Sequence, residues 1–222
     1  GGPGREPDPS TPSLVLSSVC TTTLTTWCIL LRLCGKRRLI VLPPEDGAWR
    51  LPDLLPGDFR LVEAVWVDVQ ARYAADGRFH HTLAHIGDGL HHIQPHLPQA
   101  RQPLAVPLAA RFHDAVYDPR RSDNEVQSAA YAAAVLSQFS LPVGLIDEVS
   151  RLIALTERHE TAVSDTDGHI LLDADLAILA AEPARYDAYA QAIRREYAHV
   201  PEAAYRQGRT AVLEQLLARP SL

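Results

Sequence analysis

The side chains best suited to chemistry in this chain are His81, His85 and the adjacent pair His113-Asp114. His81 and His85 are four residues apart, so on a helix they project from the same face and both can reach one ion. His113 and Asp114 end an apolar run. Since neighbours on a helix lie about 100° apart, both can contact an ion at the edge of a buried face. Together these residues suggest that a divalent metal is held in a helical core.

Two further acids, Asp173 and Asp175, lie within an otherwise apolar run, residues 170–181. A carboxylate in such surroundings costs several kcal/mol unless it is paired or binds a metal. Asp173 shares one side of the predicted helix with Ala177 and Ala180, whose small side chains leave room for a neighbouring helix or an ion. Both acids are therefore candidates for the same metal site.

Each of these features also has an explanation without a metal. Six of the ten histidines lie between His80 and His96, so a pair at this spacing arises easily by chance, and ordinary surface or core histidines account for His81 and His85 taken alone. A histidine near a helix C-terminus is favoured by the helix dipole, although the same dipole disfavours Asp114. Capping of a helix start accounts for one of the two later aspartates, but less readily for both.

Other catalytic arrangements have less support in the sequence. His159 follows a predicted helix, either as a further ligand or proton donor or as an ordinary loop histidine. The sequence Gly87-Asp88-Gly89 lies inside a helical pattern, so it does not indicate a phosphate-binding loop. The chain has no Gly-x-Ser-x-Gly elbow, and its three cysteines all lie in the first 34 residues. A metal site is therefore the chemistry that the sequence favours.

Hydrophobic periodicity predicts that helices carry these side chains. From Asp58 onwards apolar residues recur at spacings of three and four, and turn residues such as Asp76-Gly77 and Asp118-Pro119 separate the periodic runs. No run alternates as a half-buried strand does, so we expect an all-α bundle of about seven to eight helices. The predicted helices cover residues 59–73, 82–95, 104–117, 124–136, 142–156, 170–181, 183–199 and 201–218.

The beginning of the chain differs from this pattern. We predict that residues 1–52 form a low-complexity, poorly structured extension and that residues 53–222 form the helical domain. Residues 13–33 are uncharged until Arg32, but their many serines and threonines leave only a weak case for a membrane anchor. The chain contains no methionine, even at position 1, so we expect a fragment, a processed form or a reading frame extended upstream of its true start.

Composition restricts the partners that the domain is expected to have. The formal net charge is −6 and the one basic run is Lys36-Arg37-Arg38, which argues against a nucleic-acid groove. The absence of cysteine after Cys34 fits a reducing cytoplasm, so we expect a cytoplasmic protein that does not cross a membrane. The sequence leaves the oligomeric state open.

The candidate residues recur in six stretches whose order is informative. These stretches are Arg78-Phe-His-His-Thr-Leu-Ala-His-Ile86, Phe112-His-Asp-Ala-Val-Tyr-Asp118, Ser122-Asp-Asn-Glu125 with Ser128-Ala129, Leu171-Leu-Asp-Ala-Asp-Leu-Ala-Ile-Leu179, Ile193-Arg-Arg-Glu-Tyr197 and Tyr205-Arg-Gln-Gly-Arg209. In this order they resemble the HD-domain superfamily of metal-dependent phosphohydrolases, most closely a small bacterial family of predicted HD phosphohydrolases. The resemblance covers the chain from about residue 58 to its C-terminus and implies an HD-like helical fold.

The resemblance also implies a set of metal ligands. It assigns His113, Asp114 and Asp173 to the metal, together with either His85 or His81. His85 is favoured because its place before an apolar helix is more similar to that of the family's first histidine. The chain departs from the family pattern at His80, where an aromatic residue is common, and at Val126, where a second acid is common. Neither departure affects the proposed ligands, but both alter the expected pocket.

The implied activity is hydrolysis of a phosphomonoester or phosphoanhydride, such as a nucleotide, by metal-activated water. The ligand set suits Mn²⁺, Mg²⁺, Fe²⁺, Co²⁺ or Zn²⁺ without selecting one. Asp114 is expected to orient the water, and Glu125 or His159 to move protons. Arg78 and Arg121 are expected to bind the phosphate of a small phosphorylated substrate.

Three other functions are compatible with the same residues. The domain would be a non-catalytic helical module if its metal pocket held a nucleotide without hydrolysing it. The metal would be structural if its ligand shell were closed and the helices served oligomerisation. An HD-like di-iron oxygenase is the third alternative, which iron analysis of the purified protein would test.

Overall fold

The computed structural model describes residues 28–33, 36–41 and 51–219, and the chain divides into two compact units, residues 1–47 and 48–222. In the first unit, β1 (Cys28–Leu33) and β2 (Lys36–Val41) pair as an antiparallel two-stranded sheet, with Cys28 opposite Val41. These two strands lie within the extension that was predicted to be poorly structured, and runs rich in Ile, Leu and Val suit such strand pairing. The rest of the predicted extension up to residue 50, and residues 13–27 of the predicted anchor, lie outside the described residues.

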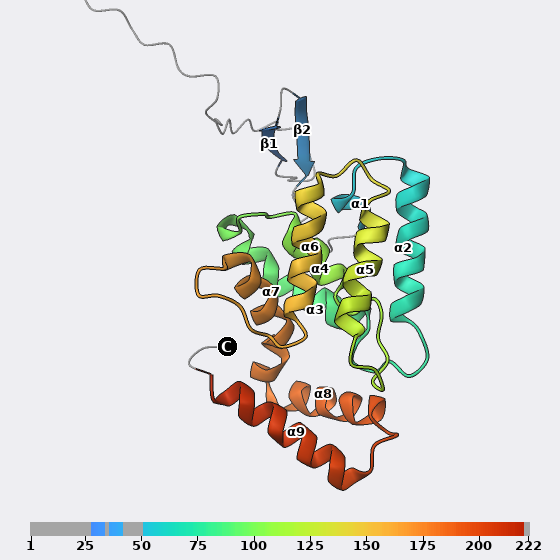
Figure 1. The fold of residues 1–222 in the computed structure, drawn as a ribbon, viewed down its shortest axis with the longest axis vertical. Coiled ribbons are helices and arrows are strands. Elements are labelled where there is room, and N and C mark those ends of the chain that lie inside the picture. Colours follow the sequence, from blue (N-terminus) through green and yellow to red (C-terminus); the bar gives the residue numbers. More distant parts are fainter. Residues whose placement is uncertain (1–27, 34–35, 42–50, 220–222) are drawn as a thin grey trace, which may run out of the picture. The chain divides into compact units, whose positions relative to one another are not determined.

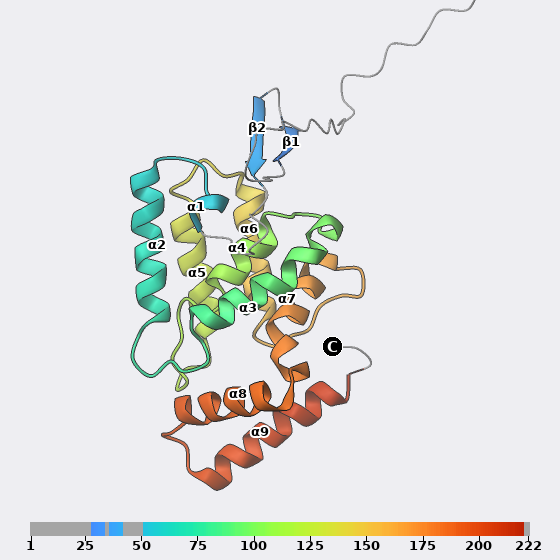
Figure 2. The same ribbon diagram turned by 180° about the vertical axis from the view of Figure 1, so that it is seen from behind.

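The described part of the second unit contains α-helices and short 3-10 helices but no strand, which confirms the all-α prediction. The elements are α1 (Leu51–Leu54), α2 (Phe59–Tyr73), α3 (Leu83–Ile93), η1 (Gln94–Gln99), α4 (Ala105–Phe112), α5 (Asn124–Leu136), α6 (Val143–Leu155), α7 (Thr166–Leu176), η2 (Ala177–Ala180), α8 (Pro183–Glu196) and α9 (Glu202–Leu217). Most of the α-helices pack around one central helix, α4, and the last two helices of the chain, α8 and α9, lie outside this group (Figures 1 and 2).

The central element is α4, and every one of its eight residues is buried. It packs against α3, α5, α6 and α7, and it lies among these helices in both views (Figures 1 and 2). Small side chains at Ala105, Ala109 and Ala110 allow the neighbouring helices to approach closely. Because α4 is enclosed on all sides, whatever follows its last residue, Phe112, begins inside the domain.

A single hydrophobic cluster surrounds α4 and holds the helices together. Its largest fully buried side chains come from six of the other α-helices as well as from α4 itself. These side chains are Leu51, Val69, Tyr73, Ile86, Leu90, Ile93, Leu108, Phe112, Leu136, Leu152, Ile153 and Leu171. In contrast, α8 buries only Ile193 and Glu196, and α9 buries only Leu216, so these two helices form an outer layer.

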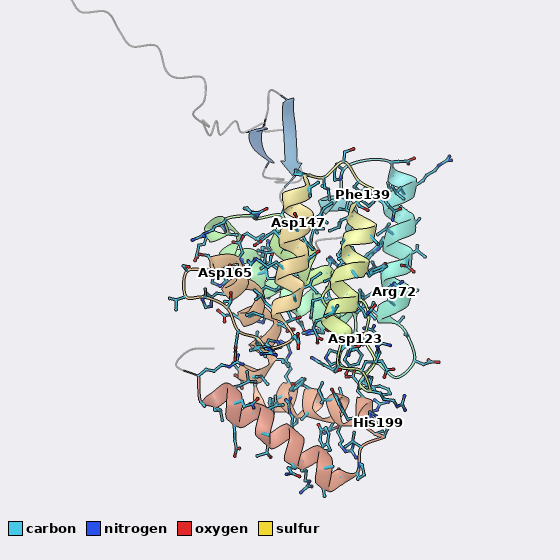
Figure 3. The ribbon with its side chains drawn as sticks, in the orientation of Figure 1. Arg72, Asp123, Phe139, Asp147, Asp165 and His199 are labelled. Atoms are coloured by element: carbon cyan, nitrogen blue, oxygen red, sulfur yellow. The ribbon has the colours of Figure 1, made fainter. Side chains whose placement is uncertain are left out.

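Two helix boundaries differ from the prediction in ways that affect the site. The helix predicted at 104–117 ends at Phe112, because Ser128 holds the next turn by accepting from the Val116 N–H (3.0 Å) and donating to the Val116 carbonyl (3.1 Å). The helix predicted at 170–181 begins at Thr166, where the Asp165 side chain caps it by accepting from the Gly168 N–H (Figure 3). The buried residues of α7, among them Leu171 and Ala174, show which face of the helix packs inward.

None of the described helices has both the length and the apolarity that are needed to cross a bilayer.

The core predicts a contrast between two positions on α6. Leu152 is fully buried, whereas Val143 on the same helix is 73% exposed. Leu152→Ala should lower the free energy of unfolding by about 2–5 kcal/mol, because it leaves a cavity next to α4. Val143→Ala should change it by less than about 0.5 kcal/mol. Urea denaturation monitored by circular dichroism measures both, and equal effects would contradict the described packing of α6.

Candidate metal centre

Three predicted ligands meet where the start of α3 faces the end of α4. His85 lies in the first turn of α3, His113 caps the C-terminus of α4, and Asp114 follows it. One ligand atom from each side chain lies within 4.8 Å of the other two. His85 and His113 are buried, and Asp114 is nearly so. Among the described residues, this is the one group of His, Cys, Asp or Glu side chains that meets this test for a metal site.

The orientation of His113 suits a metal ligand. Its Nδ1 lies 3.0 Å from the Ala110 carbonyl oxygen, and because a carbonyl only accepts, Nδ1 carries the proton and donates it. Nε2 is thereby directed at Asp114 Oδ2, 3.0 Å away. Both atoms are buried and neither has a hydrogen-bond partner among the described residues. Buried polar atoms are rarely left unsatisfied, so this pair fits a site that receives a cation.

Asp175 of α7 completes the cluster from the opposite side. Its Oδ1 lies 2.9 Å from His85 Nε2 and 3.3 Å from His113 Nε2. Its Oδ2 accepts a hydrogen bond from His159 Nε2 at 2.8 Å. One carboxylate therefore contacts three histidines, and it is the second acid available to a cation held by His85, His113 and Asp114.

Asp173 does not join this cluster, which corrects the ligand set implied by the family resemblance. Its side chain is exposed on α7, whereas the side chain of Asp175 is 12% exposed. Residues two apart on a helix point in directions about 200° apart, so only one of the two acids can face α4. Leu171 is buried one turn before Asp175 and marks the inward face. The pKa of Asp173 is raised above its ordinary value, because partial burial outweighs the nearby His169 and His96, whose charges lower it.

His159 reaches the cluster from the segment that follows α6. Its backbone has a positive φ of 53°, which is uncommon for a residue other than glycine. Arg219 holds this backbone by donating to the carbonyl of His159 and, at 2.7 Å, to that of Arg158. The strained turn directs the imidazole towards Asp175, and such strain persists where surrounding contacts over-determine it. The prediction that His159 lies near the site agrees with its position.

His81 lies beside the cluster and is held by Glu196 rather than by the other ligands. Its Nδ1 donates to Glu196 Oε2 at 2.6 Å, and its ring stacks on Tyr117 with 4.0 Å between centroids. The ring of His81 is 6.2 Å from that of His85. Of the two histidines left open by the sequence, the structure places His85 in the cluster.

Glu196 was not identified as a site residue from the sequence. Its Oε1 accepts from the backbone N–H groups of Phe79, His80 and His81 at 2.7, 2.7 and 3.1 Å. Its Oε2 accepts from the Tyr117 hydroxyl at 2.9 Å and from His81. The sequence does contain a signal that Glu196 is buried, because it follows the apolar Ile193 by three residues and so lies on the same side of the helix. Glu196 fixes the segment that leads into α3.

The charges of the cluster act strongly on one another. Burial lowers the pKa of His113, but the Asp114 and Asp175 carboxylates outweigh this and raise it well above its ordinary value. Burial raises the pKa of Asp114, yet His113 and His81 hold it below its ordinary value. The pKa of Asp175 is lowered in the same way, mainly by His113. Two ionised carboxylates in a buried site create a negative potential that favours a cation.

The predicted phosphate-binding arginines lie elsewhere. The Arg78 guanidinium donates to the backbone carbonyls of His81 (3.1 Å), Asp114 (2.7 Å) and Ala115 (3.3 Å). It therefore holds together the two backbone segments that carry His81 and Asp114. Arg121 is exposed and pairs with Asp123, which Figure 3 labels at the N-terminal end of α5. Both predictions of substrate contact are corrected, because neither side chain lines a pocket at the cluster.

Glu125, the predicted proton carrier, lies in the first turn of α5. Its charge is among those that raise the pKa of Tyr197, after burial. Neither Glu125 nor His159 lines a pocket at the cluster, but His159 contacts Asp175 at 2.8 Å and is therefore the better-placed candidate for proton transfer.

A pocket of about 220 Å³ opens beside the cluster. His85 and Asp175 form part of its lining, which continues over α3, α7, η2 and α8. His85, His113 and Asp175 also line a second, smaller pocket of about 10 Å³, close to the space that one water molecule needs. His85 and Asp175 therefore belong to the lining of both pockets.

The cluster predicts a difference in cation affinity between two aspartate variants. Asp114→Asn should weaken the binding of Mn²⁺ or Zn²⁺ at least about tenfold, because even the loss of an outer-shell partner costs about 10–100-fold. Asp173→Asn should bind as the wild type does, because its side chain faces solvent. Isothermal titration calorimetry and metal analysis measure both. Equal affinities of the two variants would contradict the assignment of Asp114.

The five contacts of Glu196 predict a pH-dependent stability effect. Burial raises the pKa of Glu196, but the hydrogen bond from His81 and the backbone donors lower it from 4.5 to about 2. The folded state therefore gains stability above pH 4.5 and loses it as the pH falls towards 2. Glu196→Gln should cost about 3 kcal/mol at pH 7, and the difference from wild type should shrink below pH 4.5.

Denaturant titrations between pH 7 and pH 3.5 measure this difference. Glu214→Gln on the exposed face of α9 serves as the control, with an expected change below about 0.5 kcal/mol. A cost of Glu196→Gln that did not vary with pH would show that shape, rather than charge, explains the role of this residue.

Comparisons of the chain with protein-family models, with curated proteins and with solved structures gave no match. The resemblance to HD-domain phosphohydrolases therefore stays a prediction, and the functional argument depends on the geometry of the cluster and its pocket.

Proposed function

We propose that the protein is a metal-dependent phosphohydrolase that cleaves a phosphate ester in the pocket beside the cluster. The observation that carries this proposal is the convergence of two buried histidines and two carboxylates on one point, next to a pocket open to solvent. Such sites combine a cation with a place for a small substrate.

A divalent cation fits the donor set. His85 and His113 would offer Nε2, and Asp114 and Asp175 would offer carboxylate oxygens, a mixed set that suits Mn²⁺, Fe²⁺, Co²⁺, Mg²⁺ or Zn²⁺. When bound, such a cation supplies Lewis acidity, which lowers the pKa of water and neutralises charge on a phosphoryl oxygen. The orphaned Nε2 of His113 and Oδ2 of Asp114 support this assignment.

The remaining chemistry falls to side chains of this chain. The Asp114 carboxylate is placed to accept a hydrogen bond from the water that attacks phosphorus, and so to orient it. As the ester oxygen leaves, it needs a proton, and we assign its transfer to His159, a partly exposed imidazole 2.8 Å from Asp175. The hydrogen bond from His159 Nε2 to Asp175 at 2.8 Å fixes the orientation of that ring.

A purely structural metal fits less well. A structural site has a closed ligand shell, whereas His85 and Asp175 also line a pocket of about 220 Å³. Structural sites also favour cysteine ligands, and residues 35–222 contain none. The pocket therefore favours a site that receives a small molecule.

The proposal predicts that hydrolysis depends on Asp114. With Mn²⁺, Mg²⁺, Fe²⁺, Co²⁺ or Zn²⁺ added in turn, the wild type should hydrolyse members of a panel of nucleotides and simple phosphate esters. Asp114→Ala should lower kcat/KM at least about 100-fold, because it removes the group that orients water. Asp173→Ala and Arg121→Ala should remain within about twofold of wild type.

Phosphate release, followed with a colorimetric assay on purified protein of known metal content, measures these rates. Activity that survives Asp114→Ala would exclude this site as its source. Retention of a nucleotide without product after long incubation would favour the non-catalytic binding module.

A further inference from the structure

We infer that the pocket beside the cluster selects phosphomonoesters whose single phosphate is attached to a small, uncharged and weakly polar body. The inference rests on the proposed function, in which the cluster binds the phosphate. The pocket then receives what the phosphate is attached to, because His85 and Asp175 belong to both.

Small apolar side chains dominate the walls of the pocket. One wall comes from α3, a second from the end of α7 with η2, and a third from α8, which passes below the ends of α3 and α7 in Figures 1 and 2. The apolar lining residues are Phe79, Ala84, Ala174, Ala177, Ile178, Ala188 and Ala192. Alanine offers neither donors nor acceptors, so a body rich in hydroxyl groups would lose its water without replacing those hydrogen bonds.

The one arginine in the lining is already neutralised. Arg185 of α8 pairs with Asp88 of α3 at 2.5 Å, and both side chains are about half exposed. The pair joins two walls of the pocket and adds no net charge. Arg185 is therefore not a free cation for a second phosphate or carboxylate.

The other ionisable side chains of the lining do not supply a matching cation either. The His80 ring packs against the rings of His85 and Tyr189, with 4.5 and 4.6 Å between centroids, so it contributes aromatic surface to the lining. Asp175 adds negative charge at the inner end. The Tyr189 hydroxyl accepts from Arg209 at 2.7 Å, which holds that guanidinium against the tyrosine and outside the lining. His92 is the remaining ionisable group and lies on an exposed face.

Size restricts the body further. About 220 Å³ is below the range of roughly 300–1,000 Å³ typical of pockets for drug-sized ligands. Tyr189 and His80 meet edge to face at 4.6 Å and present aromatic surface to this space. A single ring or a short apolar chain fits these limits, whereas a polyphosphate or an oligonucleotide does not.

The test compares two esters that differ in one charge, phenyl phosphate and 4-carboxyphenyl phosphate. The wild type should hydrolyse phenyl phosphate with a kcat/KM at least about tenfold higher, because the carboxylate meets no free cation. Phenylphosphonate and 4-carboxyphenylphosphonate, which cannot be hydrolysed as esters, should show the same order of affinity by isothermal titration calorimetry. Equal or reversed preferences in both measurements would overturn the inference.

Two variants link the preference to the pocket. Ala188→Phe should weaken phenylphosphonate binding about tenfold without lowering metal content, because the larger ring fills space at an exposed position. Ala130→Phe, at an exposed position of α5 away from the pocket, is the matched control and should bind normally. Asp88→Asn leaves Arg185 unpaired and should improve the relative affinity for 4-carboxyphenylphosphonate. Unchanged binding in Ala188→Phe would overturn the inference.

Failure of the proposed function gives a different result. In that case no ester is hydrolysed with any of the five metals, while phosphonate binding still reports on the pocket. If the wild type then binds phenylphosphonate more tightly than 4-carboxyphenylphosphonate, and Ala188→Phe abolishes this preference, the pocket is a binding site without hydrolysis. No detectable binding of either phosphonate would overturn it.

Discussion

The enclosure of α4 on all sides is the constraint on which the site depends. A helix without a solvent-facing side ends inside the domain. The two polar residues that follow α4, His113 and Asp114, therefore lie in a buried place. His113 Nε2 and Asp114 Oδ2 end there without hydrogen-bond partners, which costs free energy that apolar residues at these positions would avoid. Stability alone gives no reason to place His113, Asp114, His85 and Asp175 together, whereas cation binding does.

The second constraint is the attachment of the outer helices to this core. α8 buries one apolar side chain, Ile193, and one carboxylate, Glu196. That carboxylate accepts three backbone N–H groups from residues 79–81, so it ties α8 to the segment that leads into His85. Arg78 holds the same segment from the other side through the carbonyls of His81 and Asp114. These two charged residues position the ligands without contacting the pocket.

Much of this arrangement could be predicted from sequence, because it follows from local periodicity. Spacings of three and four predicted the helices, and the apolar run that ends in His-Asp singled out His113 and Asp114. The four-residue spacing left both His81 and His85 as candidates, and only the family resemblance favoured His85. The choice between Asp173 and Asp175 required knowing which face of α7 packs against the core, and the buried Leu171 and Ala174 mark that face.

Local sequence patterns could not predict the hydrogen-bond and ion-pair partners of several charged residues. Arg78 and Arg121 both looked available for phosphate, but their partners are backbone carbonyls in one case and a nearby aspartate in the other. Glu196 lies 115 residues from His81, and no spacing rule connects them. The strands of residues 28–41 were missed because a short aliphatic run beside Ser and Thr residues carries little periodic signal.

The structure divides the site into a rigid part and an adaptable part. The ligands come from α3, α4 and α7, whose apolar faces form the core, so their geometry is fixed by packing that a substitution disturbs at a cost of several kcal/mol. The outer wall of the pocket comes from α8, where Arg185 and Ala188 are exposed and contribute little to that core. Changes on α8 can therefore alter which small molecule fits the pocket while the cluster stays intact. If the proposed function holds, a fold organised in this way would separate the chemistry at the phosphate from the selection of the substrate.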